Sequence, residues 1–215
     1  MDRFTQFGRN HISSPPLATS HFGRPGAVDR GKPRATGLRS RLRKWYDPPC
    51  EIAPPDHITA AWLTVQRETF PSIDGIFMLD DIVGFVGEQD FREFGVPYFR
   101  ELYAADVAVK FFHNDAKCEK SIGLYPEIGI NLYNPGIFNT LAELRQLSGG
   151  QLAILGNIPP RDVLAKGSPA DVRAEVKKLL AETPDRSRLI LSCAGGMPPG
   201  VSTENIRAFV EAARG

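Results

Sequence analysis

Short apolar runs alternate with amphipathic stretches along the chain from Pro55 onward. Each run holds four to six residues, is rich in isoleucine, leucine, valine and phenylalanine, and is followed by polar residues. Runs of this kind are typical of strands that are buried in a parallel sheet. The predicted strands cover residues 75–79, 107–112, 130–134, 152–156 and 189–192.

The stretches between these runs carry apolar residues at the spacing of an amphipathic helix. Pro97 falls inside one of them and predicts a break or kink there. Ser168 begins the strongest one, with Pro169 in the first turn and Asp171 three residues after the cap, which is a helix-start pattern. Helices are predicted over residues 56–70, 88–105, 138–147, 168–180 and 206–213.

Strands that alternate with helices predict repeated βα units and a parallel sheet. The spacing fits an open doubly wound sheet or part of a (βα)8 barrel. No GxGxxG or GxxxxGK[ST] turn follows any predicted strand, which disfavours a nucleotide-binding open sheet. Polar residues cluster directly after the strands, where barrel active sites form, although any turn also needs polar residues. The sequence therefore predicts an α/β domain over residues 56–215.

The first 55 residues have a different composition. Residues 1–50 hold ten Lys or Arg against three Asp, whereas the remainder holds 16 basic and 22 acidic residues. This stretch is rich in Gly, Pro, Ser and Arg and shows neither helical nor strand periodicity. Such a segment buries too little apolar surface to offset its chain entropy. We expect residues 1–55 to form a disordered, basic extension.

Composition excludes several classes of protein. No apolar run is long enough to span a membrane, and the amino terminus lacks the apolar core of a secretory signal. Cys50, Cys118 and Cys193 are too few for a disulfide framework, which favours a reducing cytoplasm. The net charge of +1 argues against a dedicated nucleic-acid binder. A cytoplasmic protein that binds neither membrane nor nucleic acid is expected.

Three segments in order resemble the uroporphyrinogen decarboxylase family, which also includes cobalamin-linked methyltransferases. They are IFMLDDIVGFVGEQDFREFGVPYFREL, LAILGNIPPRDVLAKGSPADVRAEVKKLL and LILSCAGGMPPGVSTENIRAFVEAARG. The resemblance covers about 145 residues and implies a (βα)8, or TIM, barrel. Only the later part of that barrel has counterparts here, so the expected fold is an incomplete, TIM-barrel-like structure of about five βα units.

The family's namesake activity, decarboxylation of a tetrapyrrole, is the default function that the resemblance implies. The half of the barrel that supplies the decarboxylase catalytic aspartate has no counterpart in residues 1–55. Asp81 stands where decarboxylases place a substrate-facing serine, and Gly195 stands where they place a late histidine. Asp81 is a predicted catalytic residue, because Asp80 and Asp81 can act as an acid pair or bind cationic groups. The structural alternative is that one of these two carboxylates is solvated and the other caps the following turn.

The methyltransferase branch implies metal-assisted transfer of a corrinoid-bound methyl group to a thiol. Its zinc site uses an H-x-C pair and a late cysteine; here His113 matches the histidine, Asp115 replaces the first cysteine and Gly195 the second. Nitrogen, oxygen and sulfur can all bind zinc. A zinc site of His113, Asp115 and Cys193 is therefore expected, with His113 also catalytic and Cys118 as a substitute thiol. The alternative is that His113 forms an ordinary hydrogen bond and both cysteines are buried packing residues.

Other polar and glycine residues follow the predicted strands. Asn134, Asn157 and Gly195, together with Asp80, are predicted to bind the substrate, a small tetrapyrrole or corrinoid-linked molecule; turn formation explains them equally well. A third hypothesis is a truncated, inactive remnant or a partner-dependent half-barrel. Five parallel strands leave unpaired edges, so a homo-oligomer or a complementing chain is an expected partner.

Overall fold

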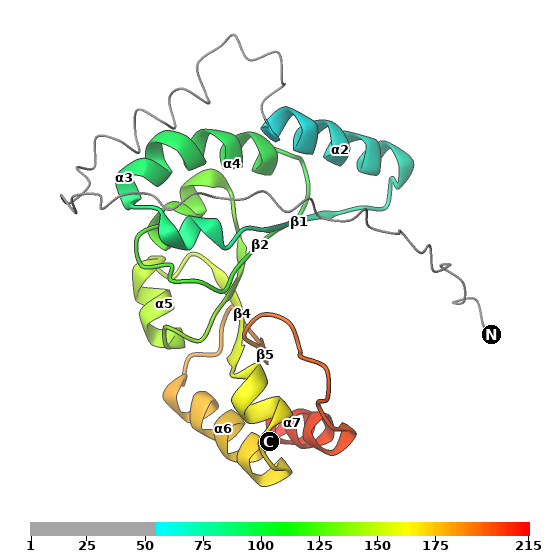
Figure 1. Ribbon diagram of the computed structural model, residues 1–215, viewed down its shortest axis with the longest axis vertical. Coiled ribbons are helices and arrows are strands. Elements are labelled where there is room, and N and C mark those ends of the chain that lie inside the picture. The colour runs from blue at the N-terminus through cyan, green and yellow to red at the C-terminus, as the bar shows by residue number, and fades with distance from the viewer. Residues whose placement is uncertain (1–54) are drawn as a thin grey trace, which may run out of the picture. The chain divides into compact units, whose positions relative to one another are not determined.

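The computed structural model describes residues 55–215, with side chains from Ile58 onward. Residues 1–54 lie outside the described residues, and with them nearly all of the predicted disordered extension. The described residues form a five-stranded parallel sheet with helices between successive strands (Figure 1). The predicted α/β fold is therefore confirmed.

The strands follow one another in the sheet in chain order, β1-β2-β3-β4-β5, and each neighbouring pair is parallel. A doubly wound sheet reverses its strand order at a switch point, whereas a barrel does not. Chain order therefore selects the barrel-like alternative. Among the described residues β1 and β5 each pair with one strand only, so the sheet is open. The strands are β1 Gly75–Leu79, β2 Val109–Asn114, β3 Leu132–Pro135, β4 Ala153–Ile158 and β5 Leu189–Cys193.

Helices fill the connections as predicted, with one interruption. A π-helical segment, η2, separates α3 from α4 directly before Pro97, where the sequence predicted a break. Ser168 and Asp171 form the capping box that starts α6. α6 and α7 pack against each other beside β4 and β5 (Figure 1). The α-helices are α2 Pro55–Thr69, α3 Glu88–Asp90, α4 Val96–Tyr103, α5 Leu141–Leu147, α6 Pro169–Glu182 and α7 Thr203–Arg214; the shorter segments are η1 Ile82–Phe85, η2 Phe91–Gly95, η3 Ile122–Leu124, η4 Pro126–Ile128 and η5 Pro160–Ala165.

Four of the five strands end one or two residues later than the sequence predicts. β2 includes His113 and Asn114, and β4 includes Asn157, whereas the apolar runs predict that both strands end earlier. The prediction ended each strand where its apolar run ended. The strands continue through these polar residues because their backbones stay paired at the carboxyl end of the sheet, where a barrel opens: His113 pairs with Asn134 and Asn157 with Ser192. None of the helices in residues 55–215 is long and apolar enough to cross a membrane.

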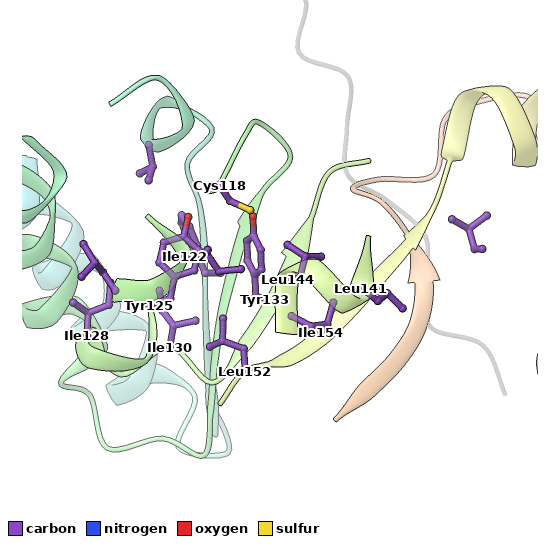
Figure 2. Packing of buried hydrophobic residues seen from close by; sticks show 14 of the residues in the cluster. Cys118, Ile122, Tyr125, Ile128, Ile130, Tyr133, Leu141, Leu144, Leu152 and Ile154 are labelled. Atoms are coloured by element: carbon purple, nitrogen blue, oxygen red, sulfur yellow. The ribbon is translucent and has the colours of Figure 1, made fainter. Parts of the chain in front are cut away.

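The helix-covered face of the sheet holds the hydrophobic core. Phe112, Tyr133 and Ile154 are almost fully buried, and Tyr133 packs with Tyr125 and Leu144 beneath the helices (Figure 2).

The opposite face, which we call the inner face, is not covered. Strand register groups Phe77 with Phe111 and Leu79 with His113 on this face. Phe77 is 54% exposed, Leu79 58% and Ile190 50%. Phe77 and Phe111 stack with their ring centroids 4.7 Å apart. In a closed barrel this face would be the packed interior.

Candidate functional site

Asp81, His113 and Asp115 meet at the carboxyl end of β1 and β2. Each offers one ligand atom, and these atoms all lie within 4.8 Å of one another. Leu79 and His113 are register partners, and Asp81 and Asp115 each follow two residues later. Side chains two residues apart in a strand share a face, so the register brings the three polar groups together. We call these three residues the DHD cluster.

The imidazole of His113 is held in one orientation by Asn134. His113 is 8% exposed, and its Nδ1 lies 2.7 Å from Oδ1 of Asn134. The amide nitrogen of Asn134 donates to the carbonyls of Leu155, at 2.5 Å, and Cys193, at 3.3 Å. The amide oxygen therefore faces the ring, and Nδ1 must carry the hydrogen. In the neutral ring Nε2 then carries the lone pair, which is the arrangement of a metal-ligating histidine.

The two carboxylates of the DHD cluster are linked through the backbone. Oδ1 of Asp81 accepts the backbone N–H of Asp115 over 3.0 Å. Asp81 is half-buried and Asp115 is exposed. Neither forms an ion pair with a lysine or arginine of residues 55–215. Two like charges this close favour a cation between them.

Gly195, in the turn after β5, forms a third wall of the cluster. A Cβ at this position would lie 3.3 Å from Oδ2 of Asp115 and 3.4 Å from Cε1 of His113. Its φ of +66° is a left-handed conformation that glycine adopts without strain. The predicted substrate-binding residue Gly195 thus lies at the cluster, and its missing side chain leaves space beside the polar atoms.

The structure does not bring Cys193 into the cluster. Cys193 is the register partner of Ile158, which is fully buried on the helix-covered face. Its Sγ lies 3.3 Å from the carbonyl oxygen of Gly195. Cys118 is 1% exposed, its sulfur lies beside the hydroxyl of Tyr133 (Figure 2), and burial raises the pKa of its thiol to about 11. Among the described residues, neither sulfur joins the ligand atoms of the cluster.

Asp80 and Asn157 form hydrogen bonds with turns. Oδ1 of Asp80 accepts the backbone N–H of Ile82 over 2.9 Å. The amide nitrogen of Asn157 donates to the carbonyls of Gly136, at 3.2 Å, and Asn139, at 2.9 Å. These contacts shape the turns after β1 and β3. Substrate binding by Asp80 and Asn157 stays a prediction.

Two buried tyrosines fix the strand that carries His113. The hydroxyl of Tyr103 donates to the carbonyl of Phe111 over 2.9 Å, and that of Tyr133 donates to the carbonyl of Asn114 over 3.0 Å. Burial raises the pKa of both tyrosines, so both hydroxyls stay protonated and keep donating. β2 is therefore held on both sides of His113 by groups that a neighbouring ligand does not displace.

Large apolar side chains are exposed in the turns at the same end of the sheet. Ile82 and Phe85 follow β1, Phe138 follows β3 and Met197 follows β5. Their exposed fractions are 71%, 84%, 57% and 56%. Exposed aromatic and aliphatic groups beside convergent polar atoms are typical of sites for partly apolar ligands.

Comparisons with known proteins agree on one family. The profile of the family described as uroporphyrinogen decarboxylase (URO-D) matches residues 58–215. A uroporphyrinogen decarboxylase from Chlorobium luteolum is 26% identical over 147 residues, which are 64% of this chain and 41% of that protein. A methylated-thiol–coenzyme M methyltransferase from Methanosarcina mazei is 25% identical over 131 residues, which are 60% of this chain and 34% of that protein.

A solved structure supports the fold. A methyltransferase from Methanosarcina mazei superposes with a TM-score of 0.63 at 17% identity, over 74% of this chain and 46% of that one. At this identity the likeness shows the fold, and the expected incomplete, TIM-barrel-like architecture is confirmed. The chain spans between 34% and 44% of the length of the curated relatives that it matches.

Proposed function

Because the chain belongs to the uroporphyrinogen decarboxylase family over residues 58–215, we propose that it carries the cation site of an enzyme that transfers a methyl group from a corrinoid to a thiol. The DHD cluster is the single observation that supports this proposal most. It combines one imidazole and two carboxylates, whose ligand atoms lie within 4.8 Å of one another. The sequence resemblance implies metal ligands for the methyltransferase branch of the family and none for tetrapyrrole decarboxylation.

The residues present fit a divalent cation. His113 would offer Nε2, because Asn134 occupies its Nδ1, and Asp81 and Asp115 would each offer a carboxylate oxygen. Imidazole nitrogen and carboxylate oxygen bind zinc and other divalent metals. A bound cation would supply the positive charge that favours a thiolate over a thiol at neutral pH.

The chain's own residues would orient the reactants. Asn134 holds His113 in the required tautomer, and the backbone of Gly195 leaves room for the thiol. In the transfer, the thiol sulfur would form a bond to the methyl carbon as the bond between that carbon and the corrinoid breaks. The corrinoid would keep the electron pair of that bond, and the thiol proton would pass to water at this open end of the sheet. Phe85 and Met197 would contact the apolar parts of the corrinoid.

Tetrapyrrole decarboxylation is the second candidate function. It is favoured by the similarity to uroporphyrinogen decarboxylases at 24% to 26% identity. The exposed apolar groups beside the DHD cluster suit a flat tetrapyrrole as well as a corrinoid. In this alternative Asp81 and Asp115 would act as acids or bind pyrrole N–H groups, and the reaction would not depend on a cation.

The two candidates are distinguished by one pair of assays. The protein is loaded with Zn²⁺ or Mn²⁺ and mixed with methylcobalamin and 2-mercaptoethanesulfonate, and loss of methylcobalamin absorbance and formation of the S-methyl product are measured. We expect methylation that a chelator abolishes and that His113→Gln lowers at least about a hundredfold, whereas Asp162→Asn, an exposed carboxylate on η5, leaves it unchanged. Decarboxylation of uroporphyrinogen that a chelator leaves unchanged, without any methyl transfer, would overturn the proposal.

A further inference from the structure

We infer that the DHD cluster is an oxygen-rich cation site, with Asp81 as a ligand and no sulfur, so that it discriminates against soft cations. The inference rests on the proposed cation site and adds which class of cation its three residues select. Hard donors favour cations such as Mn²⁺, whereas thiolates favour soft ones such as Cd²⁺.

Neither described sulfur belongs to the DHD cluster. Register places Cys193 on the same face as the buried Ile158, away from the inner face. Cys118 is 1% exposed and lies in the core beneath the sheet. A thiolate from either position would require β5 to change register or the core to open. Of the described cysteines, neither contributes a ligand atom to the cluster.

Asp81, and not a cysteine, is the third residue of the cluster. One of its oxygens accepts the backbone N–H of Asp115 at 3.0 Å, which fixes the carboxylate against the turn after β2. Its second oxygen remains for a ligand, because a carboxylate offers two acceptor atoms. Asp115 is exposed, so rotation of its side chain can bring an oxygen toward the same point. The two carboxylates supply the charge of −2 that balances a divalent cation.

His113 is the independent observation that points to a ligand. It is a polar side chain more than nine-tenths buried, its Nδ1 is used by Asn134, and its ring lies against Gly195. Nε2 is therefore the ring nitrogen that remains for a ligand, with its lone pair free. A histidine that served only to join β2 to β3 would not need two carboxylates within 4.8 Å of its ring nitrogen.

Gly195 supplies the space that a hard cation needs. A Cβ there would stand 3.3 Å from Asp115 and 3.4 Å from His113, so any larger residue would fill the volume beside the ligand atoms. Hard cations keep several water ligands, and a site with three protein ligands must leave room for them. An open position of this kind is also what a substrate would enter.

The test uses the cations alone. Binding of Mn²⁺ and Cd²⁺ is measured by titration calorimetry, and Co²⁺ is used as a spectroscopic probe, because thiolate ligands give it an intense near-ultraviolet charge-transfer band. Asp81→Asn removes the charge and keeps an acceptor for the Asp115 N–H. Asp115→Cys introduces a thiolate at the cluster. Asp162→Asn is the control carboxylate.

We expect Co²⁺ bound to the unsubstituted protein to lack the thiolate band and Asp115→Cys to gain it. Asp81→Asn should lower Mn²⁺ affinity by about tenfold or more with an unchanged circular dichroism spectrum, and Asp162→Asn should not. Asp115→Cys should raise the ratio of Cd²⁺ to Mn²⁺ affinity by about tenfold or more relative to the unsubstituted protein.

The outcomes separate this inference from the proposed function. A thiolate band in the unsubstituted protein, or Mn²⁺ affinity unaffected by Asp81→Asn, would overturn the inference and leave a cation site of another composition. No saturable binding of any of the three cations would overturn both. Cation binding as expected without methyl transfer would contradict the proposed function alone.

Discussion

The backbone N–H of Asp115 donates to Oδ1 of Asp81 over 3.0 Å, so the turn after β1 is joined to the turn after β2 through the DHD cluster itself. Asp81 therefore has two separable properties, an acceptor that holds the neighbouring turn and a negative charge at the carboxyl end of the sheet. A purely structural role for Asp81, as the cap of the Asp80–Asp81 pair, uses the first property and not the second.

Substitution of Asp81 by two different residues separates these properties. We expect Asp81→Ala to lower the free energy of unfolding by about 1 to 2 kcal/mol, because the Asp115 N–H loses its acceptor. Asp81→Asn should lower it by less than about 0.5 kcal/mol, since an amide oxygen still accepts. Urea denaturation followed by circular dichroism measures both. Equal losses for the two variants would mean that the charge, and not the hydrogen bond, stabilises the turn.

Asn134 is expected to position His113 rather than to bind substrate. Asn134→Ala removes the acceptor of Nδ1 and frees the ring to rotate or change tautomer, so cation affinity should fall by about 10- to 100-fold. Asn131→Ala is the matched control: its side chain accepts from the N–H of Lys110 and donates to the carbonyl of Ala108, away from the cluster. Titration of both variants with Mn²⁺ measures the two affinities. Equal Mn²⁺ affinities of Asn134→Ala and Asn131→Ala would contradict a positioning role for Asn134.

Cys118 should be inert to alkylation in the folded protein. Burial raises the pKa of its thiol to about 11, so at pH 8 only about one thiol in a thousand is the reactive thiolate, and the side chain is 1% exposed. Because the folded pKa lies above this range, the thiolate fraction rises about tenfold per pH unit between pH 8 and pH 10, so labelling of Cys118 should be very slow at pH 8 and should accelerate as the pH rises. Iodoacetamide labelling with peptide mass spectrometry compares Cys118 with the half-buried Cys193. Labelling of Cys118 as fast as that of Cys193 would contradict the packing in Figure 2.

The uncovered inner face should make the chain associate with itself or with a complementing chain. Phe77 is 54% exposed on this face and stacks on Phe111. Phe77→Asp should reduce self-association in light scattering and weaken the binding of an apolar dye, because it places a charge on the uncovered sheet. Phe70→Asp is the control, since Phe70 is 58% exposed after α2 and outside the sheet. A monomer that neither substitution changes would show that the face is protected in solution.

The sequence predicted the first strand to the residue and the order of the elements, because apolar runs and helix caps are local signals. It ended β2 before His113 because a polar residue ends an apolar run, even where that residue faces a barrel mouth. It also grouped Cys193 with His113 and Asp115, whereas the structure groups Asp81 with them. The register of β5 decides on which face of the sheet Cys193 lies. That register pairs Cys193 with Ile158, and no local sequence pattern reveals the pairing.

The most direct test of the account is the metal content of the protein after loading. Protein purified without a histidine tag is dialysed against Mn²⁺ or Zn²⁺, desalted and analysed by plasma mass spectrometry beside His113→Gln, with circular dichroism to confirm that both are folded. We expect about one cation per chain in the unsubstituted protein and less than about 0.1 in His113→Gln. Less than about 0.1 cation per chain in the folded, unsubstituted protein, or equal retention by His113→Gln, would contradict it.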